Sequence, residues 1–241
     1  MFNLDTERHW TQGRLDRIRA LFGLDGFING IHFNDLQPNK MLHDAIINEF
    51  LRWLLFHRVN TARFLFHQQA LSSWVYPQYM DGADINPNAD VVVMPINRDG
   101  THWLFVAIYP KADLFVYCDS HPEASIDGNE VIDRVKIMLE KTFPKKRFQA
   151  FETHTAPQPY RRARFPKQDN INDSGVFLCA GAMALFLDQP INFSSEDIPR
   201  FRYEMADVLI DYIASTMRGC GRPQVRYIEG STRFPVPPQY A

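Results

Sequence analysis

The clearest structural signal in the chain is the segment Gln168-Asp-Asn-Ile-Asn-Asp-Ser-Gly-Val-Phe-Leu-Cys-Ala-Gly-Ala-Met-Ala-Leu-Phe-Leu187. Residues 174–187 are almost all apolar, which predicts a helix buried on every side in a core. A side chain at position 174 then lies at the N-terminus of this helix, where free backbone N–H groups and the helix dipole favour negative charge. Such a place lowers the pKa of a thiol and stabilises a developing oxyanion. The alternative is that Asp173 or Ser174 only caps the helix.

Three short β-rich runs precede this stretch, at 90–96, 102–109 and 113–118, and the turns between them indicate an antiparallel meander. Their nearly continuous apolar sequence predicts a sheet that is covered on both faces. Adjacent antiparallel strands place the start of one beside the end of the next, so we expect His102 and Asp119 to meet at one edge of the sheet. A carboxylate that orients an imidazole is what the base in nucleophilic catalysis requires.

Each of these polar residues carries little information when it is taken alone. A histidine at the start of a strand is more often a surface or hydrogen-bonded residue, and Asp119-Ser120 by itself is more often a turn. The amide of Gln168 is a potential donor to an oxyanion, although an isolated glutamine in a loop is usually solvated.

The rest of the chain shows mainly helical spacing of apolar residues. The helices predicted from this spacing lie at 7–22, 40–57, 61–71, 129–143 and 199–217. Asn39 is expected to cap the second helix, and an edge strand is expected at 147–153. Helices around a mostly antiparallel sheet are typical of an α+β domain. The predicted organisation is a helical extension over 1–35, one domain over 36–217 and a loosely ordered tail over 218–241.

The charge is nearly balanced, with 26 Lys and Arg against 28 Asp and Glu and a formal net charge of −2. Such a chain has no global basic field for non-specific nucleic-acid binding. Three scattered cysteines, Cys118, Cys179 and Cys220, argue against a disulfide framework and against structural zinc. The longest apolar run, 176–187, is shorter than the roughly 18–20 residues that cross a bilayer. We therefore expect an intracellular protein with no nucleic-acid partner, membrane span, metal or cofactor.

Four separated blocks carry a resemblance to a known family. Leu36-Gln-Pro-Asn-Lys-Met-Leu-His-Asp-Ala-Ile-Ile-Asn-Glu-Phe50 resembles L-x-P-G-x-W-L-N-D-x-x-I-N-x-[YF], and Pro95-Ile-Asn97 with His102-Trp103 resembles P-x-N…H-W. Tyr117-Cys-Asp119-Ser120 resembles Y-x-D-S, and 168–177 resembles Q-x-N-x-x-D-C-G-[VI]-[YF]. In order and spacing the blocks are similar to the ubiquitin-like-protein-specific proteases, which are the SUMO proteases and their bacterial relatives among the adenovirus-protease-like cysteine peptidases.

This resemblance implies a papain-like or adenain-like fold with four site residues. His102 would be the general base, Asp119 its orienting carboxylate, Gln168 an oxyanion donor and residue 174 the nucleophile. The implied activity is that of a cysteine isopeptidase, which removes a modifier by cleaving after its C-terminal Gly-Gly, with SUMO as first choice and ubiquitin as second. The partners are then the modifier and its lysine conjugates, no cofactor is needed, and a monomer is expected. The implied location is the nucleus or cytoplasm, or a host cell for a translocated bacterial effector.

The largest departure from the family is Ser174, because the family has cysteine at this position. An alcohol is far harder to deprotonate than a thiol, so we expect the chain to bind a modifier but to hydrolyse little or nothing. The serine is either a substitution made to trap a substrate-bound state or a feature of a natural pseudoenzyme or serine variant. Cys179 does not replace it, since that residue is expected in a buried helical turn.

A second departure is Met41. In the family a tryptophan at this position clamps the Gly-Gly tail together with the tryptophan after the catalytic histidine, which is Trp103 here. Methionine lines an apolar channel with less rigidity. The resemblance also implies substrate contacts at Asn97 and Asp173. Asp44 lies near the channel entry, where it either pairs with an arginine of the modifier tail or is a solvated helix charge.

Other functions stay open at this point. A naturally inactive relative would be a binding module for a ubiquitin-like modifier. An acyltransferase effector of the same superfamily ranks lower, because its third residue is commonly glutamate where this chain has Asp119. The aromatic-rich segment 58–87 does not resemble the family and is either a partner-contacting insertion or an ordinary packed segment. The arginines at 161, 162 and 164 either meet an acidic partner or are solvated.

Overall fold

The computed structural model describes residues 34–60, 68–70, 74–76, 84–98, 100–121 and 128–217. The predicted helix at 7–22 and the tail at 218–241 lie outside these residues, as do Cys220 and most of the segment 58–87. In the described part of the chain, no helix has both the length and the apolar character needed to cross a lipid bilayer.

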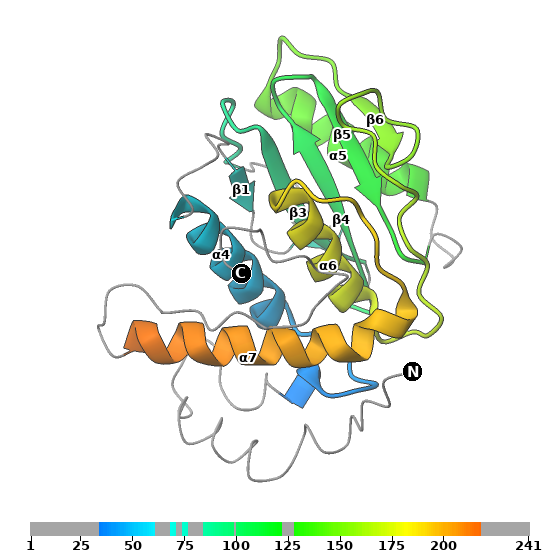
Figure 1. Cartoon of the computed structure of the whole chain (residues 1–241). Helices are drawn as coiled ribbons and strands as arrows, with labels where there is room; N and C mark the ends of the chain where they lie inside the picture. The colour runs from blue at the N-terminus through cyan, green and yellow to red at the C-terminus, as the bar shows by residue number, and fades with distance from the viewer. Residues whose placement is uncertain are drawn as a thin grey trace.

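A six-stranded sheet forms the centre of the molecule (Figure 1). Its strands are β1 (Gln68–Ala70), β2 (Trp74–Tyr76), β3 (Val91–Arg98), β4 (His102–Tyr109), β5 (Leu114–Cys118) and β6 (Gln149–Glu152). The strands β3, β4 and β5 form the predicted antiparallel meander, which is thereby confirmed. The short strands β1 and β2 pair in parallel with β3, and β6 pairs in parallel with β5 as the expected edge strand.

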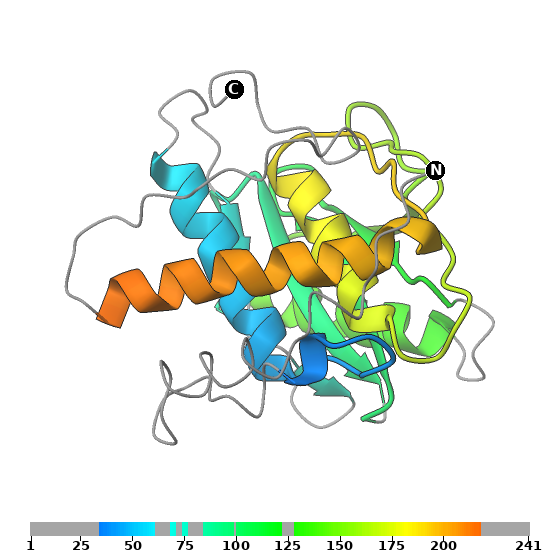
Figure 2. The ribbon, with the colours of Figure 1, turned by 60° about the horizontal axis from the view of Figure 1, so that its bottom comes forward.

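Helices cover both faces of this sheet. The helices α4 (Asp44–Asn60), α6 (Ser174–Phe186) and α7 (Ile198–Met217) pack on one face, and α5 (Gly128–Thr142) packs on the other (Figure 1). The long helix α7 lies across α4 and α6 (Figure 2). Two short 3-10 helices, η1 (Asn34–Leu36) and η2 (Ser195–Asp197), precede α4 and α7. The arrangement is the expected α+β architecture with a sheet buried between helices.

Two local predictions are wrong. Residues 68–70, which were expected in a helix at 61–71, form β1 and pair with 91–93 of β3. The partner of such an edge strand is distant in the chain, and this tertiary pairing outweighs the local helical pattern. In addition, α4 begins at Asp44, so Asn39 does not cap it. Asn39 has a φ of 60°, in the left-handed region, and lies in the turn before the helix.

Alternating side chains along the meander produce two cores, one on each face of the sheet. The core under α6 contains from the meander Val91, Val93, Trp103, Phe105, Ala107, Leu114, Val116 and Cys118. The core under α5 contains Val92, Met94, Ile96, Leu104, Val106, Ile108 and Phe115. Two buried faces explain why the three strands are apolar nearly throughout.

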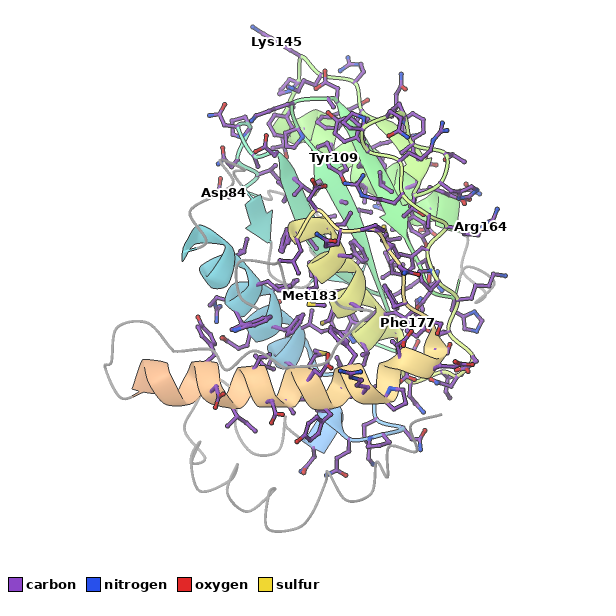
Figure 3. All side chains as sticks on the ribbon, viewed as in Figure 1. Asp84, Tyr109, Lys145, Arg164, Phe177 and Met183 are labelled. Carbon is purple, nitrogen blue, oxygen red and sulfur yellow. The ribbon has the colours of Figure 1, made fainter. Side chains whose placement is uncertain are left out.

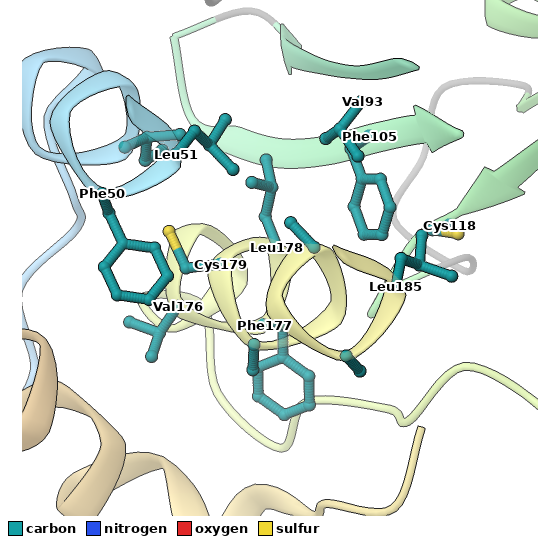
Figure 4. Close-up of a cluster of buried hydrophobic side chains, with 14 of the residues drawn as sticks. Phe50, Leu51, Val93, Phe105, Cys118, Val176, Phe177, Leu178, Cys179 and Leu185 are labelled. Carbon is teal, nitrogen blue, oxygen red and sulfur yellow. The ribbon is translucent and has the colours of Figure 1, made fainter. Parts of the chain in front are cut away.

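The helix α6 is the centre of the larger core. Every residue of α6 except Met183 is buried, which confirms the prediction made from its apolar sequence. Figure 4 shows Leu178 on the side of α6 that faces the sheet and Phe177 on the opposite side. The N-terminus of this buried helix, with residue 174, is therefore held rigidly against the sheet.

The arginine-rich loop after β6 lies at the surface. Arg164 is exposed and points away from the molecule (Figure 3). Its Nη2 lies 3.1 Å from Nε2 of His154, and Nη2 of Arg162 lies 3.0 Å from Oδ1 of Asp188. Nε of Arg161 donates to a backbone carbonyl at 2.9 Å. These arginines thus contact their own chain, and a contact with an acidic partner stays a prediction.

Candidate active site

The structure brings His102 and Asp119 together as expected. His102 is the first residue of β4, and Asp119 follows the last residue of the adjacent antiparallel strand β5. Nε2 of the imidazole lies 2.7 Å from Oδ1 of the carboxylate, and both residues are buried, with 7% of their surface exposed. This contact occupies Nε2 and leaves Nδ1 as the ring nitrogen that can exchange a proton with a nucleophile.

The carboxylate of Asp119 is held ionised by several donors. The hydroxyl of Tyr117 donates to Oδ2 at 2.8 Å, the backbone N–H of His121 donates to Oδ1 at 2.8 Å, and Nη1 of Arg98 lies 3.9 Å from Oδ2. Burial alone raises the pKa of Asp119, but the hydrogen bonds from His102, His121 and Tyr117 outweigh it and leave this pKa below its ordinary value. Asp119 is therefore a fixed negative charge behind the imidazole.

Tyr117 and Arg98 are site residues that sequence reasoning did not assign. Burial and then the charge of Asp119 raise the pKa of Tyr117, so its hydroxyl stays protonated and remains a donor. The sequence does contain a signal for Tyr117, because it precedes Asp119 by two residues and residues two apart on a strand share a face. Arg98 was placed in the turn between two strands, whereas it ends β3 opposite His102 and is 3% exposed.

Residue 174 lies beside the histidine. Ser174 opens α6, is 1% exposed, and its Oγ accepts the backbone N–H of Trp103 at 3.1 Å. Since Trp103 directly follows His102 in β4, the nucleophile position and the candidate base share one end of the sheet. Asp173 occupies the position before the helix, but its side chain makes no capping hydrogen bond. The capping alternative thus does not explain these two residues.

Gln168 is tied to the Asp119 side of the site. Its backbone N–H donates to the carbonyl of Ser120 at 2.9 Å, and its Oε1 accepts the Ser120 hydroxyl at 2.6 Å. Its Nε2 donates to the carbonyl of Asn170 at 2.5 Å. An amide nitrogen carries two N–H groups, so this arrangement orients the second one without using it. The role of Gln168 as an oxyanion donor stays a prediction.

Asp173 has a buried partner that sequence reasoning missed. Its Oδ1 accepts Nε and Nη2 of Arg202 at 3.0 and 2.5 Å, and its Oδ2 accepts Nδ2 of Asn170 at 2.7 Å. The carboxylate is thus engaged with α7, while a direct substrate contact stays a prediction. A sequence signal for Arg202 was present, because it shares the buried stripe of α7 with Ile198, Met205 and Leu209.

Gly175 is fixed by a close approach between three elements. A Cβ added at this position would lie 2.9 Å from Cβ of Leu42 and 3.1 Å from Cδ1 of Trp103. Nε1 of Trp103 donates to the carbonyl of Leu42 at 2.8 Å. The first turn of α6, the start of β4 and the segment before α4 therefore meet without room for a side chain at residue 175.

A family model described as the Ulp1 protease family, C-terminal catalytic domain, matches residues 75–215, which is more than half of the chain. The chain belongs to the Ulp1 protease family.

Curated relatives agree with this assignment. Sentrin-specific protease 2 of Rattus norvegicus is 26% identical over 71% of this chain and 30% of its own length. Ubiquitin-like-specific protease 1 of Saccharomyces cerevisiae is 24% identical over 74% of this chain and 28% of its own length. The chain thus spans less than a third of the length of these two relatives.

Solved structures show the same fold. The SUMO protease Ulp1 with its catalytic cysteine oxidized to a sulfenic acid is 19% identical, with a TM-score of 0.62 over 88% of this chain and 97% of that chain. The C-terminal Ulp1 protease domain in complex with Smt3, the yeast ortholog of SUMO, is 19% identical, with a TM-score of 0.59 over 84% of this chain and 96% of that chain. The expected α+β cysteine protease fold is confirmed.

The residues predicted to contact substrate in this Ulp1-family domain differ in how deeply they are buried. Trp103 is only 3% exposed, and Met41 is half-buried and directly precedes Leu42, whose carbonyl accepts from Nε1 of Trp103. Asn97 lies opposite Trp103 in the β3–β4 register, and its buried Oδ1 has no hydrogen-bond partner among the described residues. Asp44 is exposed at the start of α4, where its Oδ1 accepts a backbone N–H at 2.8 Å. Their roles in substrate binding stay predictions.

In the described part of the Ulp1-family domain, neither cysteine can serve as the nucleophile in place of residue 174. Cys118 and Cys179 are buried and free, and burial raises the pKa of both thiols. Neither is therefore ionised at neutral pH. Among the residues that the structure describes, no three His, Cys, Asp or Glu side chains gather closely enough to hold a metal ion.

The Tyr117→Phe variant tests the network behind the imidazole. Loss of the hydrogen bond to Asp119 is expected to lower the free energy of unfolding by about 1 kcal/mol near neutral pH. Because the folded pKa of Asp119 is depressed, its stabilising effect is present above the unfolded pKa and is lost as the pH falls through the folded value. The deficit of the variant should therefore shrink on acidification, as measured by urea unfolding over a pH series.

Tyr160→Phe is the matched control for that experiment. Tyr160 packs its ring on Tyr109 with centroids 4.5 Å apart, and phenylalanine preserves this contact away from Asp119. We expect the control to show no deficit that shrinks with acid. A deficit for Tyr117→Phe that grows as the pH falls would contradict the role assigned to this hydroxyl.

Proposed function

We propose that this chain binds the C-terminal Gly-Gly tail of a ubiquitin-like modifier in a cysteine isopeptidase site, with a SUMO-type modifier as first choice and ubiquitin as second. The observation that carries the proposal is the buried His102–Asp119 pair beside the N-terminus of α6. Family membership and the names of the relatives, which are sentrin-specific and ubiquitin-like-specific proteases, support the class of substrate. The solved complex of the Ulp1 domain with Smt3 supports SUMO as the first modifier to test.

The chemistry follows from where each group lies. With a cysteine at residue 174, a thiolate would attack the carbonyl carbon of the terminal glycine. The second Nε2–H of Gln168 and the free N–H groups in the first turn of α6 would stabilise the oxyanion. Nδ1 of His102 would protonate the departing lysine amine, and water would then hydrolyse the thioester.

Ser174 prevents the first step of this reaction. A hydroxyl is not ionised at neutral pH, and a site built for a thiolate and an imidazolium does not supply the proton transfer that serine needs. We therefore infer that the chain as it stands binds the modifier and hydrolyses little or nothing.

The Ser174→Cys variant tests this proposal with C-terminal electrophile probes built on SUMO and on ubiquitin. We expect covalent labelling of Ser174→Cys by the SUMO probe, seen as an adduct by mass spectrometry, and no labelling of the parent chain. Ser195→Cys is the matched control, since it adds a partly exposed thiol outside the site. Labelling of both cysteine variants at equal rates, or of neither by any modifier probe, would contradict a preserved peptidase site.

A natural binding module is the second candidate, and Ser174 itself favours it. In that case the parent chain binds SUMO or ubiquitin by calorimetry, and binding is lost when the two C-terminal glycines of the modifier are removed. Such binding together with an unlabelled Ser174→Cys variant would replace the peptidase by a reader of the modifier.

A further inference from the structure

Arg202 of α7 is the largest fully buried side chain in the described part of the chain. On one side its guanidinium holds the loop before the nucleophile position. Nε and Nη2 donate to Oδ1 of Asp173 at 3.0 and 2.5 Å, and Nη2 also donates to the carbonyl of Asn172 at 3.2 Å. The carbonyl of Asp173 in turn accepts the N–H groups of residues 176 and 177, so this loop is the start of α6.

On the other side the same guanidinium holds the backbone before α4. Nη1 donates to the carbonyls of Asp35 and Gln37 at 2.9 and 3.3 Å, and Nη2 donates to the carbonyl of Lys40 at 2.6 Å. Lys40 is followed by Met41, which is the residue expected to line the channel for the modifier tail. We call residues 35–42 the entry segment.

The planar fork of arginine is needed for this double contact. An ion pair with Asp173 alone could also be made by lysine, whose ammonium is a compact point charge. Only the fixed, diverging N–H groups of a guanidinium reach Asp173 and the carbonyls of the entry segment at the same time. The two parts that Arg202 joins meet again at Gly175, where an added Cβ would lie 2.9 Å from Leu42. The distance between the loop before α6 and the entry segment is therefore fixed both at Arg202 and at Gly175.

We propose that Arg202 is a positioning residue that sets the distance between the entry segment and the nucleophile position, and thereby the place of the modifier tail relative to the attacking atom. This inference rests on the proposed function. Arg202 contacts neither His102 nor Asp119, so it acts on the placement of the tail and not on the proton transfer between residue 174 and the imidazole. A small displacement of reacting groups is enough to slow a reaction by roughly 10- to 100-fold.

The first arm of the test needs no activity. Hydrogen exchange is measured on the parent chain, on Arg202→Lys and on the double variant Arg202→Met with Asp173→Asn, which removes both buried charges together. We expect faster exchange in the entry segment and at 169–174 in both variants, with the sheet unchanged. Arg200→Met is the matched control, because Nε of Arg200 contacts Glu204 of the same helix at 2.8 Å.

The second arm uses the same substitutions in the Ser174→Cys variant. We expect kcat/KM for a fluorogenic SUMO C-terminal substrate to fall by roughly 10- to 100-fold in both Arg202 variants. In Arg202→Lys, which keeps both buried charges, the rate and pH profile of alkylation by iodoacetamide should not change, since this small reagent reports the thiol and His102 and needs no tail. A merely structural loss would lower both rates together.

The outcomes separate the two proposals. Unchanged exchange in the entry segment, full activity of Arg202→Lys, or a parallel fall of turnover and alkylation would each overturn the role of Arg202. Absence of turnover and labelling in Ser174→Cys itself would contradict the proposed function, and the exchange arm would still decide whether Arg202 places the entry segment. Local loss of protection with slowed turnover and normal alkylation supports the inference.

Discussion

In the Ser174→Cys variant, replacement of Asp119 by alanine will lower kcat/KM for a SUMO C-terminal substrate by roughly 10³-fold. Asp119 is the direct partner of Nε2 of His102 at 2.7 Å and so orients that ring nitrogen. Without the carboxylate, the imidazole loses both its fixed tautomer and the negative charge that stabilises its protonated form. The thiol should then also react more slowly with iodoacetamide, which distinguishes this variant from Arg202→Lys.

Two further variants serve as comparisons for the activity of Asp119→Ala. Asp119→Asn keeps an oxygen that can accept from Nε2, so we expect it to retain more activity than the alanine variant. Asp113→Ala removes a half-exposed carboxylate that pairs with Lys146 at 2.6 Å, and it should leave turnover unchanged. Equal activity of Asp119→Ala and its Ser174→Cys parent would show that the buried pair is not the catalytic one.

The Gly175→Ala variant will be less stable than the parent by about 1–3 kcal/mol, as expected for an overpacked core. In the middle of a helix, alanine is favoured over glycine by roughly 0.5–1 kcal/mol. Here the sign reverses, because the new Cβ would lie 2.9 Å from Cβ of Leu42, an atom next to the backbone that cannot swing away. Denaturant unfolding measures the change, and modifier binding should weaken with it.

Gly128→Ala is the matched control for this substitution. Gly128 also opens a helix, and its added Cβ would meet the end of the Tyr117 side chain at 3.3 Å, a looser contact than the 2.9 Å at Gly175. We expect a neutral or slightly stabilising change there. A stabilised Gly175→Ala protein would show that Leu42 and Trp103 do not crowd the start of α6.

The central elements of the fold could be predicted from the sequence because their signals are local. The apolar runs of β3, β4 and β5 and the apolar stretch of α6 reflect burial on all sides. The strand β1 could not be predicted in this way, because it depends on pairing with Val91–Val93, a partner more than twenty residues away. The start of α4 was missed for a similar reason, since the left-handed turn at Asn39 leaves little trace in apolar spacing.

The residues of the candidate site also fall into those that the sequence predicts and those that it does not. His102 and Asp119 could be paired from strand order alone, and the placement of residue 174 follows from the buried helix that it opens. Arg98 could not be assigned, because a charged residue at a strand end is usually solvated, and the place of Arg202 on the buried stripe of α7 does not reveal its partner. Their partners lie far away in the sequence and become visible only when the chain is folded.

The hydrogen bond from Arg202 to the carbonyl of Asp35 closes a loop of 167 residues. Contacts of such long range form late in folding, because the chain entropy of closing the loop must be overcome first. During synthesis, a nascent chain that already contains His102, Asp119 and Ser174 still lacks the hydrogen bonds that Arg202 of α7 supplies. The ribosome therefore has to release α7 before the candidate site is complete, so a nascent chain without α7 does not carry the finished site.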